Sequence, residues 1–256
     1  MKITIFTSDS PRHYSLINKL SAKHKCYAVI EKKNNSSKKR IKKKQTLKEK
    51  YFNKVLKSEN KIFKNDIFLK KCEKFLFIKY PELSNTKKKY LNTFLKSDLF
   101  IVFGSSYIKG WLINFLIKKK ALNIHMGISP YYRGSACNFW ALYDKNPHFV
   151  GATIHYLNRG LDDGKILFHV LPGKKNKNSF DFTMGAVNSA QTIMVKQINN
   201  KNIFKLKSVK QNKKKEIRYS TNKEFNNQII SSYLKRKTRI DFNYNKNLYI
   251  NPKIDS

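Results

Sequence analysis

The stretch Leu99–Ser106 (LFIVFGSS) consists of an apolar run followed by a glycine-serine turn. A short apolar run that ends at such a turn is typical of a buried strand in a parallel sheet. Helical spacing follows from about Lys109 to Lys119, so a strand, a glycine turn and a helix occur in succession. In open α/β folds such a turn lies at the carboxyl edge of the sheet, where ligands bind. We therefore expect a site beside Gly104.

Strands and helices alternate on both sides of this unit, as in an α/β domain. Lys2–Thr7 and Cys26–Ile30 have strand patterns, with helical spacing from Tyr14 to Ala22 between them. The other expected elements are strands at Ala121–Ile124, Val150–Leu157 and Ile166–Val170, and helices at Tyr51–Phe75, Asn138–Tyr143 and Phe182–Asn199. The pattern predicts a Rossmann-like α/β fold with a central, mostly parallel sheet flanked by helices.

Three polar residues follow the central strands. Asn123 and His125 are two positions apart on a predicted strand, so their side chains point to the same face. Asp162 stands in the glycine-flanked segment Gly160–Gly164, and the turn-rich loop Ser129–Gly134 lies between them in the sequence. An amide, an imidazole and a carboxylate can together handle a proton and a developing oxyanion.

These residues resemble the pattern of the formyltransferases that use 10-formyltetrahydrofolate. Members of that family include glycinamide ribonucleotide transformylase, methionyl-tRNA formyltransferase and the nucleotide-sugar N-formyltransferases. The family pattern is Asn-x-His, a Ser/Leu-Pro-x-x-x-Gly loop and Leu-Asp-x-Gly, which here are Asn123–His125, Ser129–Gly134 and Leu161–Gly164. The resemblance is strongest from Ile101 to Leu171. It implies a formyltransferase fold and a catalytic triad of Asn123, His125 and Asp162.

The resemblance also implies two groups of binding residues. The folate co-substrate, 10-formyltetrahydrofolate, would contact mainly backbone groups of Tyr107, Ile108, Lys109, Gly160 and Leu161. The candidates for contact with the formyl acceptor are Ser129, Arg133, His155 and His13, each of which has an ordinary structural role as its alternative. No metal is implied, and Cys26, Cys72 and Cys137 show no CxxC spacing.

The net charge of +38 calls for a choice of partner. Clustered cations favour nucleic acids, but arginine, which supplies bidentate contacts to bases, accounts for only 7 of the 54 basic residues. Specific nucleic-acid binding is therefore not expected, and a small-molecule amine that carries negative charge suits the chain better. The unpaired cysteines and the lack of a long apolar run indicate a cytoplasmic protein without a membrane span. A homodimer is left open.

The expected domains are a catalytic domain over residues 1–200, with a Lys-rich helical insertion at about 32–97, and a basic C-terminal tail over 201–256. About 55 residues are too few for the second β-barrel domain of the tRNA-formylating branch. We therefore expect the acceptor to be a nucleotide-linked amino sugar. The alternatives are a methionyl-tRNA formyltransferase-like enzyme, a formyltetrahydrofolate hydrolase, and an RNA-binding protein without activity.

Overall fold

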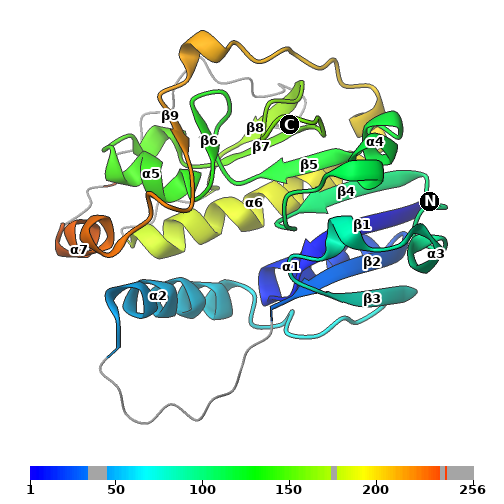
Figure 1. The fold of residues 1–256 in the computed structure, drawn as a ribbon, viewed down its shortest axis with the longest axis horizontal. Coiled ribbons are helices and arrows are strands. Elements are labelled where there is room, and N and C mark those ends of the chain that lie inside the picture. The colour runs from blue at the N-terminus through cyan, green and yellow to red at the C-terminus, as the bar shows by residue number, and fades with distance from the viewer. Residues whose placement is uncertain (34–44, 174–177, 237–239, 241–256) are drawn as a thin grey trace.

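A seven-stranded sheet forms the centre of the protein, seen in a computed structural model that describes residues 1–33, 45–173, 178–236 and 240 (Figure 1). Its strands are β1 (Lys2–Ser8), β2 (Lys25–Lys32), β3 (Lys74–Lys79), β4 (Leu99–Phe103), β5 (Leu122–His125), β7 (Ala152–Tyr156) and β8 (Ile166–Val170). They lie in the order β3-β2-β1-β4-β5-β7-β8. The first five strands of this order are parallel, while β7 is antiparallel to both of its neighbours, β5 and β8. The Rossmann-like, mostly parallel sheet is confirmed.

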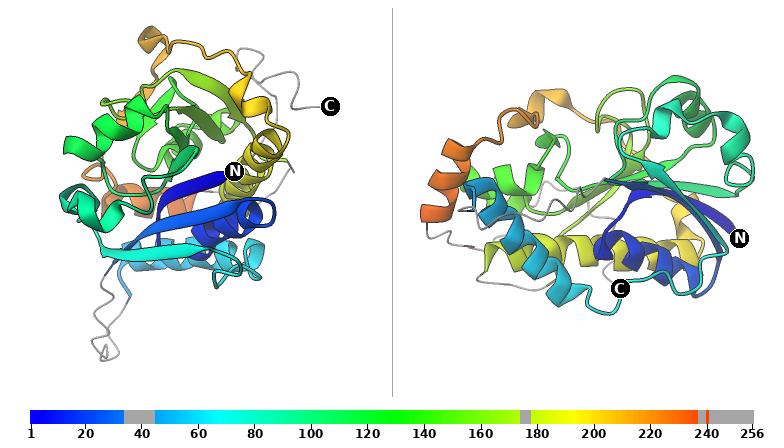
Figure 2. Two further views of the ribbon diagram at one scale, coloured as in Figure 1. Left: turned by 90° about the vertical axis from the view of Figure 1, so that its right-hand side faces the viewer. Right: turned by 60° about the horizontal axis from the view of Figure 1, so that its bottom comes forward.

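Helices cover both faces of the sheet (Figures 1 and 2). The α-helices are α1 (Pro11–Ser21), α2 (Leu47–Ile62), α3 (Lys88–Leu91), α4 (Gly110–Lys118), α5 (Cys137–Tyr143), α6 (Ser179–Asn199) and α7 (Asn227–Lys235). Short 3₁₀ helices lie at η1 (Leu83–Asn85), η2 (Pro147–Phe149), η3 (Asn202–Phe204) and η4 (Lys213–Lys215). Helices α1 and α6 pack on one face of the sheet, and α4 packs on the other.

The packing of strand β4 on both of its faces explains why its sequence is apolar without alternation. Leu99, Ile101 and Phe103 pack in the cluster beneath α1 and α6, while Phe100 and Val102 pack in the cluster beneath α4. Successive side chains of a strand point to opposite faces, so a strand covered on both faces is apolar throughout.

The chain reverses its direction of travel across the sheet next to β1. It runs outward from β1 through β2 to β3 and then returns to β4 on the other side of β1. Open α/β sheets bind ligands at the carboxyl ends of the strands beside such a switch point. The segments Ser8–Ser10 and Gly104–Ser106 follow β1 and β4 there, so the fold places a candidate site between them.

The expectation of one helix from Tyr51 to Phe75 is wrong in its second half. Helix α2 ends at Ile62, and Lys74–Lys79 forms the edge strand β3. Its sequence KFLFIK places Leu76 and Ile78 against the cluster beneath α4, whereas Phe75 and Phe77 are exposed. This two-residue alternation was the signal of a strand. Residues 34–44 of the Lys-rich stretch lie outside the described residues.

The described part of the segment after residue 200 packs on the preceding part of the chain. A two-stranded parallel sheet joins β6 (Tyr132–Gly134) to β9 (Arg218–Ser220). Helix α7 packs with α2 and α5 around shared aromatic side chains. The domain boundary at residue 200 stays a prediction, and residues 241–256 lie outside the described part.

Candidate active site

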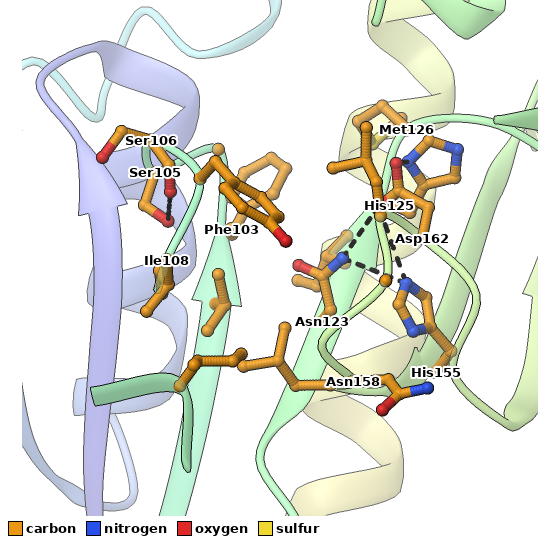
Figure 3. A pocket seen from close by; sticks show the side chains of 18 of the residues that line it. Phe103, Ser105, Ser106, Ile108, Asn123, His125, Met126, His155, Asn158 and Asp162 are labelled. Carbon is orange, nitrogen blue, oxygen red and sulfur yellow. Dashed lines mark hydrogen bonds and ion pairs between the residues drawn. The ribbon is translucent and has the colours of Figure 1, made fainter. Parts of the chain in front are cut away.

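The three polar side chains singled out from the sequence lie together. Asn123 and His125 project from β5, and Asp162 reaches them from the loop between β7 and β8 (Figure 3). Asn123 Nδ2 donates to Asp162 Oδ1 at 3.3 Å, and His125 Nδ1 lies 3.2 Å from Asp162 Oδ2. Ile124 points the other way, into the core. The shared site expected for Asn123 and His125 is present.

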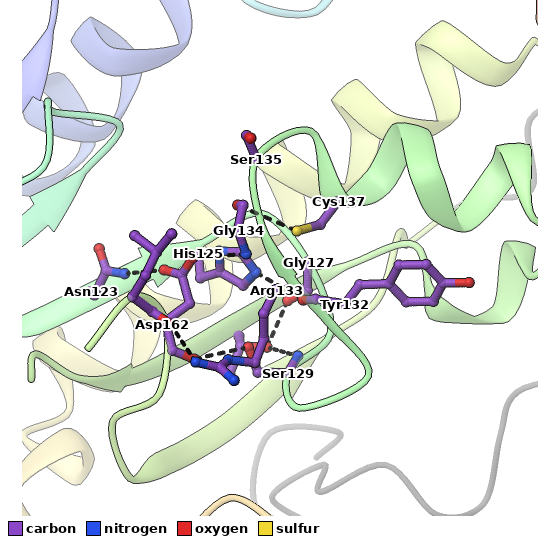
Figure 4. A network of polar contacts seen from close by, with 12 residues as sticks. Asn123, His125, Gly127, Ser129, Tyr132, Arg133, Gly134, Ser135, Cys137 and Asp162 are labelled. Carbon is purple, nitrogen blue, oxygen red and sulfur yellow. Dashed lines mark hydrogen bonds and ion pairs between the residues drawn. The ribbon is translucent and has the colours of Figure 1, made fainter. Parts of the chain in front are cut away.

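His125 is held as a buried cation. Only 6% of the residue is exposed, and Nε2 lies 3.1 Å from the carbonyl oxygen of Tyr132 (Figure 4). A carbonyl and a carboxylate only accept hydrogen bonds, so both ring nitrogens act as donors, which is the arrangement of an imidazolium. Burial by itself lowers the pKa of His125, but the carboxylate of Asp162 raises it well above its ordinary value.

Asp162 is the centre of this network. Besides its contacts with His125 and Asn123, the carboxylate accepts a hydrogen bond from the backbone N–H of Gly134 at 3.3 Å. Burial raises the pKa of Asp162, but His125 and the hydrogen bonds outweigh it and lower the pKa below its usual range. The residue has φ of 50°, in the left-handed region that non-glycine residues rarely adopt. The surrounding structure therefore has to hold this loop in place.

His155 orients Asn123 from the neighbouring strand. The two residues are register partners of β5 and β7, and Asn123 Nδ2 lies 3.0 Å from His155 Nε2. His155 Nδ1 lies 2.8 Å from the carbonyl oxygen of Tyr156, so it carries the ring proton and Nε2 accepts from the amide. Both hydrogens of the Asn123 amide therefore have protein acceptors, and the bond to Asp162 is the longer one.

A cavity of about 280 Å³ opens beside this network on the side of β4. Four of the five residues expected at the folate line it, namely Tyr107, Ile108, Gly160 and Leu161, and so do Asn123, His125, His155 and Asp162. The hydroxyl of Tyr107 donates to the carbonyl of Arg159 at 2.6 Å and so joins the two walls. Lys109 does not line the cavity; its backbone N–H donates to Ser84 Oγ at the start of α4.

The wall formed by Gly104–Tyr107 is fixed by a buried carboxylate, Glu31, at the end of β2. Glu31 accepts from the backbone N–H of Ser106 at 2.5 Å and from the hydroxyl of Ser106 at 2.7 Å. It also accepts from the backbone N–H of Leu83 at 3.2 Å. The sequence gave no signal for this role, because Glu31 follows an apolar strand far from Ser106 along the chain.

A second cavity, of about 640 Å³, meets the first at His125. Six residues line both, namely Phe103, Gly104, Ser105, His125, Met126 and Gly134. One wall is aromatic and is built by Tyr51, Phe52, Phe139, Phe180, Phe225 and Tyr233. Charged residues also line this cavity, namely Asp9, Arg12, Glu31 and Lys33. Sequence analysis missed most of this wall, because its members come from α2, α5, α6 and α7 and show no common spacing.

The four residues expected at the acceptor are divided by the structure. His13 lines the larger cavity, and His155 lines the smaller one. Ser129 and Arg133 line neither cavity and lie behind the site. Ser129 is fully buried, and its backbone N–H donates to Thr153 Oγ1. Arg133 is buried, and its guanidinium contacts Glu216 and the carbonyl of Leu161, each at 2.7 Å.

His13 is packed tightly against the turn after β4. A Cβ atom on Gly104 would lie 2.4 Å from its ring, so only glycine leaves room for the histidine. Its Nδ1 lies 2.6 Å from Thr7 Oγ1. Burial and the neighbouring charge of Arg12 lower the pKa of His13 well below its ordinary value. His13 therefore presents a neutral ring to the cavity.

Among the residues that the structure describes, no cluster of metal-ligating side chains is found. None of their helices is long and apolar enough to cross a membrane.

Comparison with known proteins gives a consistent result. The family model described as formyl transferase matches residues 1–178. Among solved structures, a 4-N formyltransferase from Francisella tularensis has a TM-score of 0.55 at 20% identity, with 88% of this chain and 77% of that chain covered. A sugar N-formyltransferase from Shewanella has a TM-score of 0.53 at 16% identity, with 88% and 78% covered.

A third solved structure is an N-formyltransferase from Helicobacter canadensis in complex with folinic acid and dTDP-3-aminofucose. Its TM-score is 0.51 at 15% identity, with 88% of this chain and 73% of that chain covered. No curated protein has a significant match to the sequence.

Proposed function

Because this chain belongs to the formyl transferase family, we propose that it transfers a formyl group from 10-formyltetrahydrofolate to a primary amine of a nucleotide-linked amino sugar. The observation that carries the proposal is the buried His125–Asp162 pair, with Asn123 beside it, where two cavities meet. Two substrates that enter from the two cavities would meet at these three groups. Their chemistry suits attack of an amine on a formyl carbon.

The smaller cavity suits the folate. Apolar walls from Val102, Ile108 and Leu157 suit a flat ring system, and the polar triad lies at the end of the cavity. Residues of the two loops 104–107 and 158–161 line it, and backbone N–H and C=O groups of these loops would contact a pterin. Tyr107, Ile108, Gly160 and Leu161 would hold the co-substrate, so that its formyl group lies near Asn123.

The triad would act on the amine and on the developing oxyanion. When the amine attacks the formyl carbon, the carbonyl oxygen gains negative charge. The Asn123 amide would give up its long bond to Asp162 and donate to this oxygen, since catalytic hydrogen bonds often tighten only in the complex with substrate. The carboxylate is then free to accept a proton from the amine.

The proton has to leave the amine and reach the leaving nitrogen of the folate. Asp162 takes it from the amine and passes it on, directly or through a water molecule. The C–N bond of the tetrahedral intermediate then breaks, which leaves a formamide and tetrahydrofolate. The imidazolium of His125 keeps Asp162 ionised between turnovers and stabilises negative charge nearby.

Residues of the larger cavity would bind and select the acceptor. Its aromatic wall offers flat apolar surface for a base or sugar ring, and Arg12 and Lys33 offer positive charge for phosphates. The Helicobacter structure, which contains a nucleotide-linked amino sugar together with folinic acid, has the same fold. A cavity with aromatic and cationic sides at the far end from the folate suits an acceptor of that kind.

The test is incubation of the purified protein with 10-formyltetrahydrofolate and separate acceptors, with products identified by mass. The panel contains dTDP- and UDP-linked amino sugars, glycinamide ribonucleotide, methionyl-tRNA, and no acceptor. We expect a mass gain of one formyl group on an amino sugar nucleotide and stoichiometric release of tetrahydrofolate. Formylated methionyl-tRNA as the sole product would contradict the acceptor, and folate turnover that is equally fast without any amine would indicate a hydrolase.

A further inference from the structure

Residues 209–220 lie against two loops of the candidate site, the Asp162 loop between β7 and β8 and the loop that follows His125. At one end, Val209 and Ile166 exchange two backbone hydrogen bonds of 2.8 Å, which attach the segment to β8. At the other end, β9 pairs in parallel with β6 of the loop that follows His125. Gln211 lies between these attachments, and it lines neither cavity. The segment also lies beyond the residues matched by the family model.

Gln211 holds the main chain of the Asp162 loop. Its residue exposure is 8%, and its Nε2 donates to the carbonyl of Asp162 at 2.9 Å and to the carbonyl of Gly164 at 2.8 Å. One amide group thus uses both of its hydrogens on one turn. Asp162 has the uncommon positive φ in this turn, so the two bonds stabilise a conformation that the residue does not favour by itself.

The same segment also holds the carboxylate end of Asp162. Gly134, whose N–H bonds the carboxylate, pairs with Ser220 across β6 and β9. A Cβ atom on Gly134 would lie 2.0 Å from the carbonyl oxygen of Ser220, so the two backbones are in direct contact. Arg133 adds a bridge, because its guanidinium contacts Glu216 of the segment and the carbonyl of Leu161, each at 2.7 Å.

We infer that residues 209–220 act as a strap that holds the Asp162 loop and the loop after His125, and that Gln211 within this strap is a positioning residue that sets the place of Asp162. The inference rests on the proposed function, since it matters only if Asp162 is catalytic. Gln211 contacts no substrate. It acts through the backbone that carries the carboxylate, and a displacement of about 1 Å in such a group can reduce the rate on the order of 100-fold.

The test compares Gln211→Met with Gln228→Met in the full chain. Methionine has nearly the size of glutamine but donates no hydrogen bond, and Gln228 is an exposed glutamine on α7. We expect Gln211→Met to reduce kcat by roughly 10- to 100-fold and to leave the KM for 10-formyltetrahydrofolate nearly unchanged. Gln228→Met should behave as the wild type. A milder variant, Gln211→Asn, keeps the amide but shortens its reach, and serves if Gln211→Met does not fold.

A readout that needs no turnover separates this inference from the proposed function. The imidazole of His125 is titrated by NMR and assigned by its loss in His125→Ala. If the strap positions Asp162, Gln211→Met loosens the ion pair and lowers the pKa of His125, while Gln228→Met leaves it unchanged. A folded Gln211→Met with wild-type titration and kcat would overturn the inference. Absence of formyl transfer by the wild type, with the His125 pKa still lowered in Gln211→Met, would overturn only the proposed function.

Discussion

Replacement of Asp162 by asparagine removes the charge at the centre of the site and keeps the size of the side chain. The carboxylate has donors on both oxygens: Asn123 Nδ2 at 3.3 Å, His125 Nδ1 at 3.2 Å and the backbone N–H of Gly134 at 3.3 Å. An amide has a single oxygen, so at least one donor faces an NH₂ group in the variant. The geometry of the triad and its charge are both lost.

Two effects together lower the turnover rate of Asp162→Asn. Without the carboxylate, burial is the main influence on the pKa of His125 and lowers it, so the ring is neutral at neutral pH. A positioned acid–base group contributes roughly 10²- to 10⁴-fold, and one group that stabilises an oxyanion contributes about 10²- to 10³-fold. We expect kcat of Asp162→Asn to fall by at least about 10³-fold, which corresponds to about 4 kcal/mol of activation free energy.

The assay is release of tetrahydrofolate at saturating substrates, with circular dichroism as a check of folding. Asp163→Asn is the matched control, because it makes the same chemical change one residue away. Asp163 accepts a hydrogen bond from Asn158 at 3.2 Å and lies 4.0 Å from Lys213 Nζ. Among the described residues, its side chain has no hydrogen bond or ion pair with Asn123 or His125. Its turnover should stay within roughly threefold of the wild type. A folded Asp162→Asn that turns over within tenfold of the wild type would refute the catalytic assignment.

Four further outcomes follow from the structure. His125→Ala should lose about as much activity as the double variant with Asp162→Asn, because groups that act as a unit are non-additive; additive losses in kcat would contradict a shared role. The free energy of unfolding of the wild type should exceed that of Asp162→Asn most clearly between about pH 4 and pH 6.5. The lowered pKa of Asp162 stabilises the folded state at pH values above the pKa of this carboxyl in the unfolded chain, and the raised pKa of His125 stabilises it at pH values below the pKa of this imidazole in the unfolded chain. This excess, measured by denaturant unfolding, should shrink at higher pH as His125 loses its proton, and a flat difference would argue against the ion pair. Glu31→Gln should raise the KM for 10-formyltetrahydrofolate several-fold with little effect on kcat, and Glu73→Gln, an exposed glutamate, should change neither. Binding to tRNA should be weak and unselective at about 0.15 M salt, whereas tight, tRNA-selective binding in a filter assay would contradict the small-molecule acceptor.

The sequence was sufficient to predict that Asn123, His125 and Asp162 lie together at one edge of the sheet. Asn123 and His125 lie on one strand, and two-residue spacing fixes their common face. Parallel strands with apolar runs carry a strong local signal, so the sheet and the place of the triad at its carboxyl edge could be predicted. The predicted helix extended wrongly to Phe75, into the strand β3. An edge strand buries only one face, and an alternation this short resembles the end of an amphipathic helix.

The residues that hold the loops of the site in place could not be predicted, because each of them bonds a residue that is far away in the sequence. Glu31 bonds Ser106, and Gln211 bonds the loop of Asp162, in pairs that no periodicity connects. Arg133 was a candidate for contact with the acceptor, with an ordinary structural role as the alternative. In the fold its guanidinium contacts Glu216, a residue of the segment that the sequence suggested was only a basic tail.

The parts of the chain divide by role. In the proposed function, the strands β4 and β5 and the loop of Asp162 supply the folate side and the triad, and all lie within residues 1–178. Much of the proposed acceptor side comes from outside these strands and loops: α2 supplies Tyr51 and Phe52, and the part of the chain after residue 178 supplies Phe225 and Tyr233. Helix α2 also holds Arg12 at that cavity, through a 3.0 Å ion pair with the buried Glu59. We therefore expect changes in these two segments to alter the choice of acceptor and to leave the chemistry at the triad the same.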